Sequence, residues 1–301
     1  MNKLKRILIS AILVTATAAC EHFESGQEVP SFIKIDAIDV QDNPTTSQSI
    51  YSGFFSSDID AVDITLLKEG DTAEVRLGTY MLPCTVPVMR EGKIKRISLL
   101  PVVKQSGIAG SRIEYYFYET LTLNNINLTA DSVTDLGTLH THYKQSVSVP
   151  WEEFFEPGPT AVRLDTVVKR LEYVADTVKS GNGCGVVRIN PSDEVVAFWA
   201  DTTIYISKKS ATVYLEMDYC TDFEFEVGLY NPTISGGENV FKSVYHFNIN
   251  SDKGWQKIYI NLGRTWSYMN NYPSIRLMFH VFNEEHRKGN LFLDNMKVVV
   301  M

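Results

Sequence analysis

The period of the apolar residues constrains this chain more than any other feature. Valine, isoleucine and aromatic residues alternate with polar residues over short stretches, and Gly, Pro, Asn or Asp separate these stretches. A helical repeat is present only weakly, in residues 164–178, which also alternate enough to form a strand. The 15 Tyr and 15 Phe favour strands as well. The sequence therefore predicts an all-β fold.

The alternation is most regular after the turn at 181–185. It predicts strands at 186–189, 195–199, 203–206, 212–219, 223–229, 244–249, 255–262, 274–282 and 291–300. Short strands at intervals of about 10–15 residues are typical of a two-sheet sandwich. We expect residues 161–301 to form one such domain.

Residues 31–136 predict a second β-sandwich. Strands are expected at 31–40, with a shift of phase, and at 63–66, 73–78 and 94–103. Pro83 and Pro87 predict an extended edge at 81–88. Residues 137–160 contain three prolines and are expected to be a linker or crossover, with a short helical turn at 151–155.

Two resemblances sharpen these predictions for the first domain. The segments Leu77-Gly78-Thr79-Tyr80-Met81-Leu82-Pro83, Pro87-Val88 and Glu91-Gly92-Lys93 resemble PEGA-type β-sandwich modules. Together with 107–112 and 115–118, they are also similar to a group of Bacteroidetes lipoproteins. PEGA-type modules are mostly structural or binding appendages, so the resemblance implies such a role.

The C-terminal domain resembles carbohydrate-binding jelly rolls of the galactose-binding-like type. The resemblance rests on a late strand that opens with Trp255 and on the last strand, Phe292-Leu293-Asp294-Asn295-Met296-Lys297-Val298. It implies a jelly-roll fold. It also implies a structural calcium ion with Asp294 as a ligand, and otherwise we expect no cofactor.

The N-terminus predicts export and lipid attachment. Lys3, Lys5 and Arg6 precede an apolar stretch at 7–14 that is too short to span a bilayer as a helix. The sequence Thr17-Ala18-Ala19-Cys20 then resembles a bacterial lipobox, which implies cleavage after residue 19 and a diacylglycerol on Cys20. The alternative is an ordinary signal peptide in which the cysteine occurs by chance.

Residues 20–30 form an acidic tether after the expected cleavage site. The acidic residues after Cys20 resemble the surface-export signal of Bacteroidetes lipoproteins, and the alternative is a solvated linker. We therefore expect an outer-membrane lipoprotein that faces the periplasm or the cell surface.

The charge balance argues against nucleic acid as a partner. The whole chain has 28 Lys and Arg against 36 Asp and Glu, and removal of residues 1–19 takes away three of the basic residues. The net charge of the mature chain is then about −11, whereas nucleic-acid phosphates require a basic face.

The sequence contains no catalytic motif. His140 and His142 have the spacing of a strand metal pair, but no Asp, Glu or Cys stands at a matching short distance, which favours histidines placed by chance. The adjacent pairs Glu152–Glu153, Asp193–Glu194 and Glu284–Glu285 would point to opposite faces of a strand, unlike the opposed carboxyl groups of a glycosidase. We therefore expect no enzymatic activity. The alternative is a hydrolase, which would require a cleft with opposed carboxylates or a nucleophile–base pair, and the order of residues in the sequence does not exclude this.

Three cysteines remain besides Cys20. Cys184 and Cys220 fall in one predicted domain and could form a disulfide in an oxidising compartment. The alternative is that these two and Cys84 are packed thiols.

The segment Trp266-Ser267-Tyr268-Met269-Asn270-Asn271-Tyr272 is the predicted ligand site. It lies between two predicted strands and combines aromatic rings, which stack on sugars, with amides, which bond to hydroxyls. The predicted ligand residues are Trp266, Tyr268, Asn270, Asn271 and Tyr272. The alternative is that the aromatic residues fold back over the sandwich core.

Together these features predict a non-enzymatic lipoprotein that binds a glycan or another extracellular ligand through the C-terminal jelly roll. The alternative is a structural or assembly lipoprotein that docks to an envelope protein. The expected partners are thus a membrane, through the lipid, and a glycan or an envelope protein.

Overall fold

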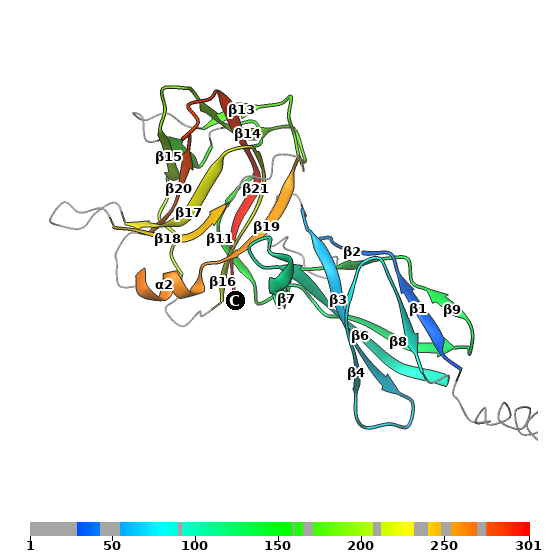
Figure 1. Cartoon of the computed structure of the whole chain (residues 1–301). Helices are drawn as coiled ribbons and strands as arrows, with labels where there is room; N and C mark the ends of the chain where they lie inside the picture. Colours follow the sequence, from blue (N-terminus) through cyan, green and yellow to red (C-terminus); the bar gives the residue numbers. More distant parts are fainter. Residues whose placement is uncertain are drawn as a thin grey trace, which may run out of the picture.

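The structure, a computed structural model, describes residues 29–42, 55–89, 92–158, 160–164, 171–206, 212–231, 240–247, 254–269 and 275–301. In this part of the chain almost all regular structure is β, arranged as two sandwiches (Figure 1). Helical residues occur only in α2 (Gly263–Met269) and in one 3₁₀ turn, Ala109–Ser111. The predicted all-β fold is confirmed. No helix among the described residues is long and apolar enough to span a membrane.

The first sandwich has one large sheet with the strand order β4-β3-β6-β7, and β8 also pairs with β6. Its strands are β3 (Ile59–Lys68), β4 (Val75–Met81), β6 (Gly92–Lys104), β7 (Arg112–Glu114) and β8 (Leu121–Leu128). The remaining strands pair in the orders β5-β1-β9 and β10-β2. They are β1 (Ser31–Ile35), β2 (Ala37–Val40), β5 (Cys84–Val88), β9 (Val133–Asp135) and β10 (Thr138–Thr141).

The phase shift predicted in 31–40 is present. Ile33 and Ile35 of β1 are buried, and so are Ile38 and Val40 of β2, which have the opposite parity. Asp36 lies between the two strands and restores the inward orientation of the apolar side chains. The predicted edge is also correct, because β5, which contains Pro87, lies at the end of its sheet.

The second sandwich is a jelly roll, as predicted. One sheet, named here the β21 sheet, has the order β13-β14-β21-β16-β19, with β11 also paired to β21. The other, named the β20 sheet, has the order β12-β15-β20-β17-β18. Most consecutive strands from β14 to β21 therefore lie in opposite sheets, which is the double Greek-key pattern of a jelly roll.

The strands of the second sandwich are the following. The β21 sheet contains β11 (Ser148–Glu153), β13 (Glu172–Val174), β14 (Cys184–Ile189), β16 (Val213–Thr221), β19 (Gln256–Asn261) and β21 (Gly289–Val300). The β20 sheet contains β12 (Val162–Leu164), β15 (Val195–Ala200), β17 (Glu224–Asn231), β18 (Val240–Phe247) and β20 (Arg276–Phe282).

Residues 137–160 are not a free linker. Their first part forms β10 in the first sandwich, and their second part forms β11, which pairs with β21 in the second. The helical turn predicted at 151–155 was wrong, because Trp151 belongs to β11 and is buried in the core of the second sandwich. The strand predicted at 203–206 is irregular chain.

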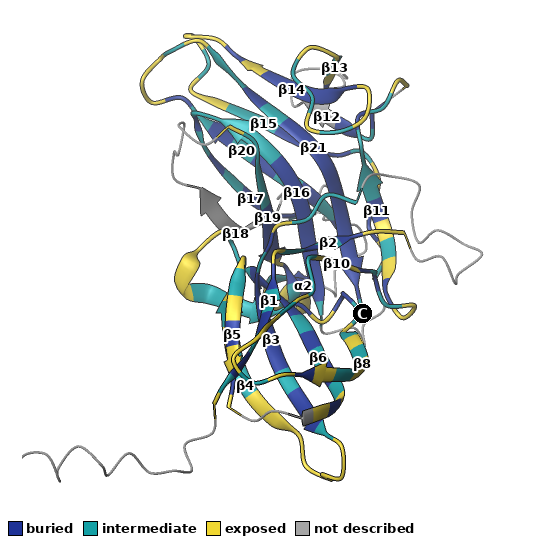
Figure 2. Cartoon of the chain, turned by 90° about the vertical axis from the view of Figure 1, so that its right-hand side faces the viewer, coloured by how far each residue is buried: buried dark blue, intermediate teal, exposed yellow. Residues whose placement is uncertain are grey.

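The first sandwich covers the outer face of the β21 sheet. Tyr214, Tyr259 and Val299 point away from the core of their own sandwich and lie in the hydrophobic core of the first. The ring of Tyr115 lies 5.5 Å from that of Tyr214 and 4.9 Å from that of Tyr259, between centroids. Figure 2 shows β16 and β21 buried along most of their lengths. The two sandwiches therefore pack as one body.

A buried ionic cluster lies at this interface. The Glu216 carboxylate is fully buried and accepts hydrogen bonds from the hydroxyl groups of Tyr115 and Tyr143, each at 2.7 Å. Lys297 Nζ lies 3.5 Å from the same carboxylate. Burial lowers the pKa of Lys297 to about 8, and the nearby Glu216 opposes that shift.

Cys184 and Cys220 do not form a disulfide. β14 and β16 pair with opposite sides of β21, so the two cysteines lie about two strand spacings, or about 10 Å, apart. A disulfide requires Cα atoms within about 7 Å. Cys184 instead directs its Sγ to the Thr177 carbonyl, at 2.6 Å.

Candidate functional site

The outer face of the β20 sheet carries the best candidate site in the second sandwich. Because the first sandwich covers the β21 sheet, the β20 sheet is the one whose outer side chains remain partly exposed. Leu277, Phe279 and Val281 of β20 point into the core, so the alternate residues Arg276 and Met278 point outward.

Arg276 is the chemically distinctive residue of this face. Its side chain is only partly exposed, and its Nε is buried without a hydrogen-bond partner. A guanidinium has five donors, and a buried donor left without a partner costs about 1–3 kcal/mol. Tyr230 of β17 stands directly opposite Arg276 in the sheet. The exposed part of the Arg276 side chain is where a ligand would meet this residue, beside an aromatic ring.

A tryptophan and a glycine lie beside Met278, the next outward-facing residue of β20 after Arg276. Met278 pairs with Trp199 of β15 on one side and with Gly228 of β17 on the other. The Trp199 side chain is partly exposed on the same face as Arg276. Gly228 is buried and lies at the point where the register between β17 and β18 shifts, which accounts for a glycine within this strand. We name Trp199, Gly228, Tyr230, Arg276 and Met278 the β20 face.

The next row of the same sheet is an ion pair. His280 Nδ1 lies 2.8 Å from Glu226 Oε1, and both side chains are mostly buried. The His280–Glu226 pair lies next to the β20 face and can form hydrogen bonds at its border.

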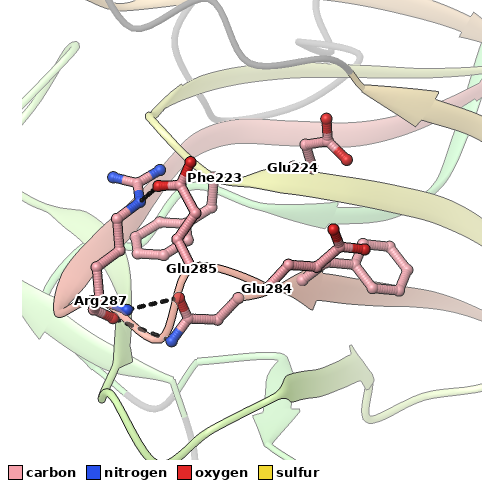
Figure 3. Close-up of a pocket in the computed structure, with 7 residues that line it drawn as sticks. Phe223, Glu224, Glu284, Glu285 and Arg287 are labelled. Carbon is pink, nitrogen blue, oxygen red and sulfur yellow. Dashed lines mark hydrogen bonds and ion pairs between the residues drawn. The ribbon is translucent and has the colours of Figure 1, made fainter.

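A small acidic pocket continues from this end of the sheet (Figure 3). It has a volume of about 100 Å³ and is lined by Phe223, Glu224, Phe282, Asn283, Glu284, Glu285 and Arg287. The Arg287 guanidinium lies 4.3 Å from the centre of the Phe223 ring, and its Nε lies 2.9 Å from Glu285. Asn283 Nδ2 donates to the Arg287 carbonyl, at 3.0 Å, which holds the turn. Its small volume and internal pairing make it a border of the face and not a separate ligand cavity.

The ligand residues predicted from the sequence are only partly brought to this region. Residues 263–269 form α2 and not a loop; Tyr268 on it is 68% exposed, whereas Trp266 is 5% exposed and belongs to the core. A buried indole has no ring face exposed to a sugar. Trp266 therefore matches the alternative given by the sequence, in which the aromatic residues of this segment fold back over the sandwich core. Asn270, Asn271 and Tyr272 lie outside the described residues, in the segment that leads into Arg276.

Asp294 does not fit a calcium site. It is fully buried; Oδ2 accepts a hydrogen bond from the backbone N–H of Ser180 at 3.1 Å, and Oδ1 accepts one from that of Asn295 at 2.8 Å. Each oxygen thus already bonds to a backbone donor, and the carboxylate is closed to solvent. Burial raises the pKa of Asp294 to about 7. Among the described residues, no three His, Cys, Asp or Glu side chains are grouped to hold a metal ion.

His140 and His142 each bind protein groups. His140 Nδ1 contacts the Asp39 carboxylate, and His142 Nδ1 lies 3.1 Å from the Gln41 carbonyl. Of the acidic pairs, Glu153 is tied to the backbone N–H of Phe155, at 2.7 Å, and Glu285 to Arg287.

Part of the β20 face could be predicted from the sequence. Alternation in 274–282 would place Arg276, Met278 and His280 on one side of a strand. It could not show that this side is outward, because that depends on which sheet the first sandwich covers.

No protein-family model matches the sequence, and no curated protein matches it. The resemblance to PEGA-type modules therefore stays a prediction.

Among solved structures, the chain is similar to the CBM22-1 xylan-binding domain from Paenibacillus barcinonensis Xyn10C, at 13% identity and a TM-score of 0.38, over 52% of this chain and 97% of that one. It is also similar to the K3 adhesin domain of Lys-gingipain from Porphyromonas gingivalis, at 10% identity and a TM-score of 0.35, over 51% and 99%. A carbohydrate-binding module of the β-sandwich superfamily matches 91% of this chain and 99% of its own, at 12% identity and a TM-score of 0.37. Likeness at this level assigns no ligand to this chain.

Proposed function

We propose that this chain is a non-catalytic binding protein that holds a glycan on the β20 face. The observation that carries the proposal is the partly buried Arg276, whose Nε lacks a partner, in a row with Tyr230 and next to the row of Trp199. Sugars bind where an aromatic surface meets polar groups that are free to bond to hydroxyls. Ion pairs occupy several of the other arginines; the carboxylate partners are Asp63 for Arg76, Asp60 for Arg112, Glu172 for Arg188 and Asp222 for Arg287.

A glycan-array screen of the purified full chain in detergent tests this proposal, followed by titration of the glycans that bind. Trp199→Ala and Arg276→Ala should each weaken binding by about tenfold or more, since stacking and a satisfied charged donor each contribute about 1 kcal/mol or more. The matched control is Tyr173→Ala in β13, on the other sheet, which should bind as wild type does.

Tyr268→Ala in α2 tests the loop that the sequence predicted. Loss of binding in Tyr268→Ala with none in Trp199→Ala would move the site from the β20 face to that loop. Absence of binding to any glycan would contradict the proposal and favour the alternative of docking to an envelope protein.

The proposal includes anchoring to the outer membrane through lipid on Cys20. It rests on the apolar leader and the small residues that precede this cysteine. We expect Cys20→Ser to abolish incorporation of labelled palmitate in cells and to release the protein from the membrane fraction. Unchanged labelling of Cys20→Ser would contradict lipid attachment at this residue.

A further inference from the structure

The outer face of the β4-β3-β6-β7 sheet contains a trough that is separate from the β20 face. It has a volume of about 640 Å³ and is lined by Ala61, Arg76, Thr79, Met81, Val102, Arg112, Ile113, Glu114 and Tyr116. Pockets that bind small ligands typically have volumes of about 300–1,000 Å³. The trough belongs wholly to the first sandwich.

The register of the strands explains its shape. Met81, Ala61, Val102 and Glu114 stand opposite one another on β4, β3, β6 and β7 in turn. Ala61 and Val102 are small and form the floor, where they are 0% and 2% exposed, whereas larger side chains stand at both ends. The trough therefore crosses four strands, a length of about 14 Å at about 4.8 Å per strand.

Two large apolar side chains are left exposed in it. Met81 is 60% exposed and Tyr116 is 50% exposed. The Tyr116 hydroxyl donates to the Glu114 carboxylate, and Lys144 Nζ lies 5.5 Å from the ring centre. The trough thus combines an aromatic ring and a thioether with polar groups at its edges, which is a surface suited to a ligand with both C–H faces and hydroxyl groups.

The two arginines of the trough are neutralised within the protein. Arg76 Nε donates to Asp63 Oδ1 at 3.0 Å, and Thr79 donates to the same carboxylate at 2.7 Å. Arg112 Nη2 donates to Asp60 at 2.7 Å. Glu114 lines the trough as well and forms no ion pair with the described residues; its carboxylate accepts only from the Tyr116 hydroxyl. The lining therefore offers an anionic ligand no free cation, whereas a neutral ligand needs none.

The position on a sheet face excludes binding of a peptide through its backbone. β3 pairs with β4 on one side and with β6 on the other, so the backbone groups of the floor are already bonded. Peptides that extend a sheet need an unpaired edge. Side-chain donors, acceptors and one ring remain, and these suit hydroxyl groups.

We propose that this trough is a second ligand site, which binds a neutral oligosaccharide in the first sandwich. The site stands on its own geometry and does not depend on the β20 face. If both sites are occupied, the packed interface holds them at a fixed separation, and a polymeric glycan that reaches both would bind more tightly than its fragments.

Methionine methyl groups allow the two sites to be observed separately. Met81 lies in the trough and Met278 in the β20 face, whereas Met217 and Met296 are buried in the core and serve as references. The full chain in detergent, labelled with ¹³C-methyl methionine, is titrated with cellohexaose, xylohexaose and mannohexaose, and with hexagalacturonate and chitosan hexamer as charged probes.

We expect the Met81 signal to move with at least one neutral probe, and less with the anionic hexagalacturonate. Tyr116→Ala should raise the concentration at the midpoint of this shift by about tenfold or more, whereas Tyr116→Phe, which keeps the ring, should stay within about threefold of wild type. Trp199→Ala should leave the Met81 shift unchanged.

The trough proposal is overturned if Met81 does not respond to any neutral probe, or responds equally in Tyr116→Ala. A response of Met278 without one of Met81 would sustain the β20 face alone. A response of Met81 without one of Met278 would sustain the trough alone.

Discussion

At the scale of single residues, the fate of each buried charge separates structural from binding roles. Glu216 and Lys297 are buried, paired with each other, and joined by tyrosine hydroxyls, so their charges are used inside the protein. Asp294 is likewise closed off by backbone donors. The buried Nε of Arg276 has no hydrogen-bond partner, and the same holds for Lys257 Nζ in the buried cluster. Arg276 differs in its position on the outer face of the β20 sheet, where its side chain is partly exposed.

Burial of Asp294 predicts a specific dependence of stability on pH. Its pKa is raised from 3.8 to about 7, chiefly by burial, with the Asp218 carboxylate acting in the same direction. Between about pH 4 and 7 the folded protein therefore binds a proton that the unfolded chain has lost, so this residue makes the fold more stable as pH falls through 7. The contribution is on the order of 4 kcal/mol at most.

Urea unfolding at several pH values between 5 and 8 measures this contribution. The free energy of unfolding of wild type, minus that of Asp294→Asn, should increase as the pH is lowered from 8 to 5. A difference that stays constant, or that decreases, would show that Asp294 does not titrate in this range.

At the scale of the elements, sequence patterns located strands better than the surfaces they form. The alternation at 212–219, 223–229 and 274–282 correctly located β16, β17 and β20. Two predictions failed because strand formation depends on a neighbouring strand, which the local pattern does not show. Residues 151–153, expected in a helical turn, pair with β21, whereas residues 203–206, expected to be a strand, form none. The sequence pattern also did not show that Trp266 is buried, because α2 turns its side chain into the core.

At the scale of the whole molecule, the two sandwiches are joined by contacts that a sequence pattern could not reveal. Alternation predicts that one face of each sheet is buried, yet Tyr214, Glu216 and Tyr259 bury the second face of the β21 sheet as well. This choice leaves the β20 sheet open and fixes its position relative to the trough. The interface therefore determines which surfaces can bind a ligand.

Replacement of Glu216 should test directly how the two sandwiches are held together at their interface. Glu216→Ala leaves the hydroxyl groups of Tyr115 and Tyr143 without their acceptor and takes away the carboxylate 3.5 Å from Lys297. Breaking a buried pair by removing one partner typically costs about 3–5 kcal/mol. We expect a loss of this size in chemical unfolding, together with faster proteolysis of the segment between β10 and β11, where the chain passes from one sandwich to the other.

The matched control is Glu172→Ala, because Glu172 forms an ion pair with Arg188 at the surface, where the two side chains are 45% and 54% exposed. Exposed pairs contribute about 1 kcal/mol or less, so this variant should be nearly as stable as wild type. If Glu216→Ala lost no more stability than Glu172→Ala, the ionic cluster would not hold the sandwiches together. Their union would then rest on the aromatic contacts of Tyr115, Tyr214 and Tyr259 alone.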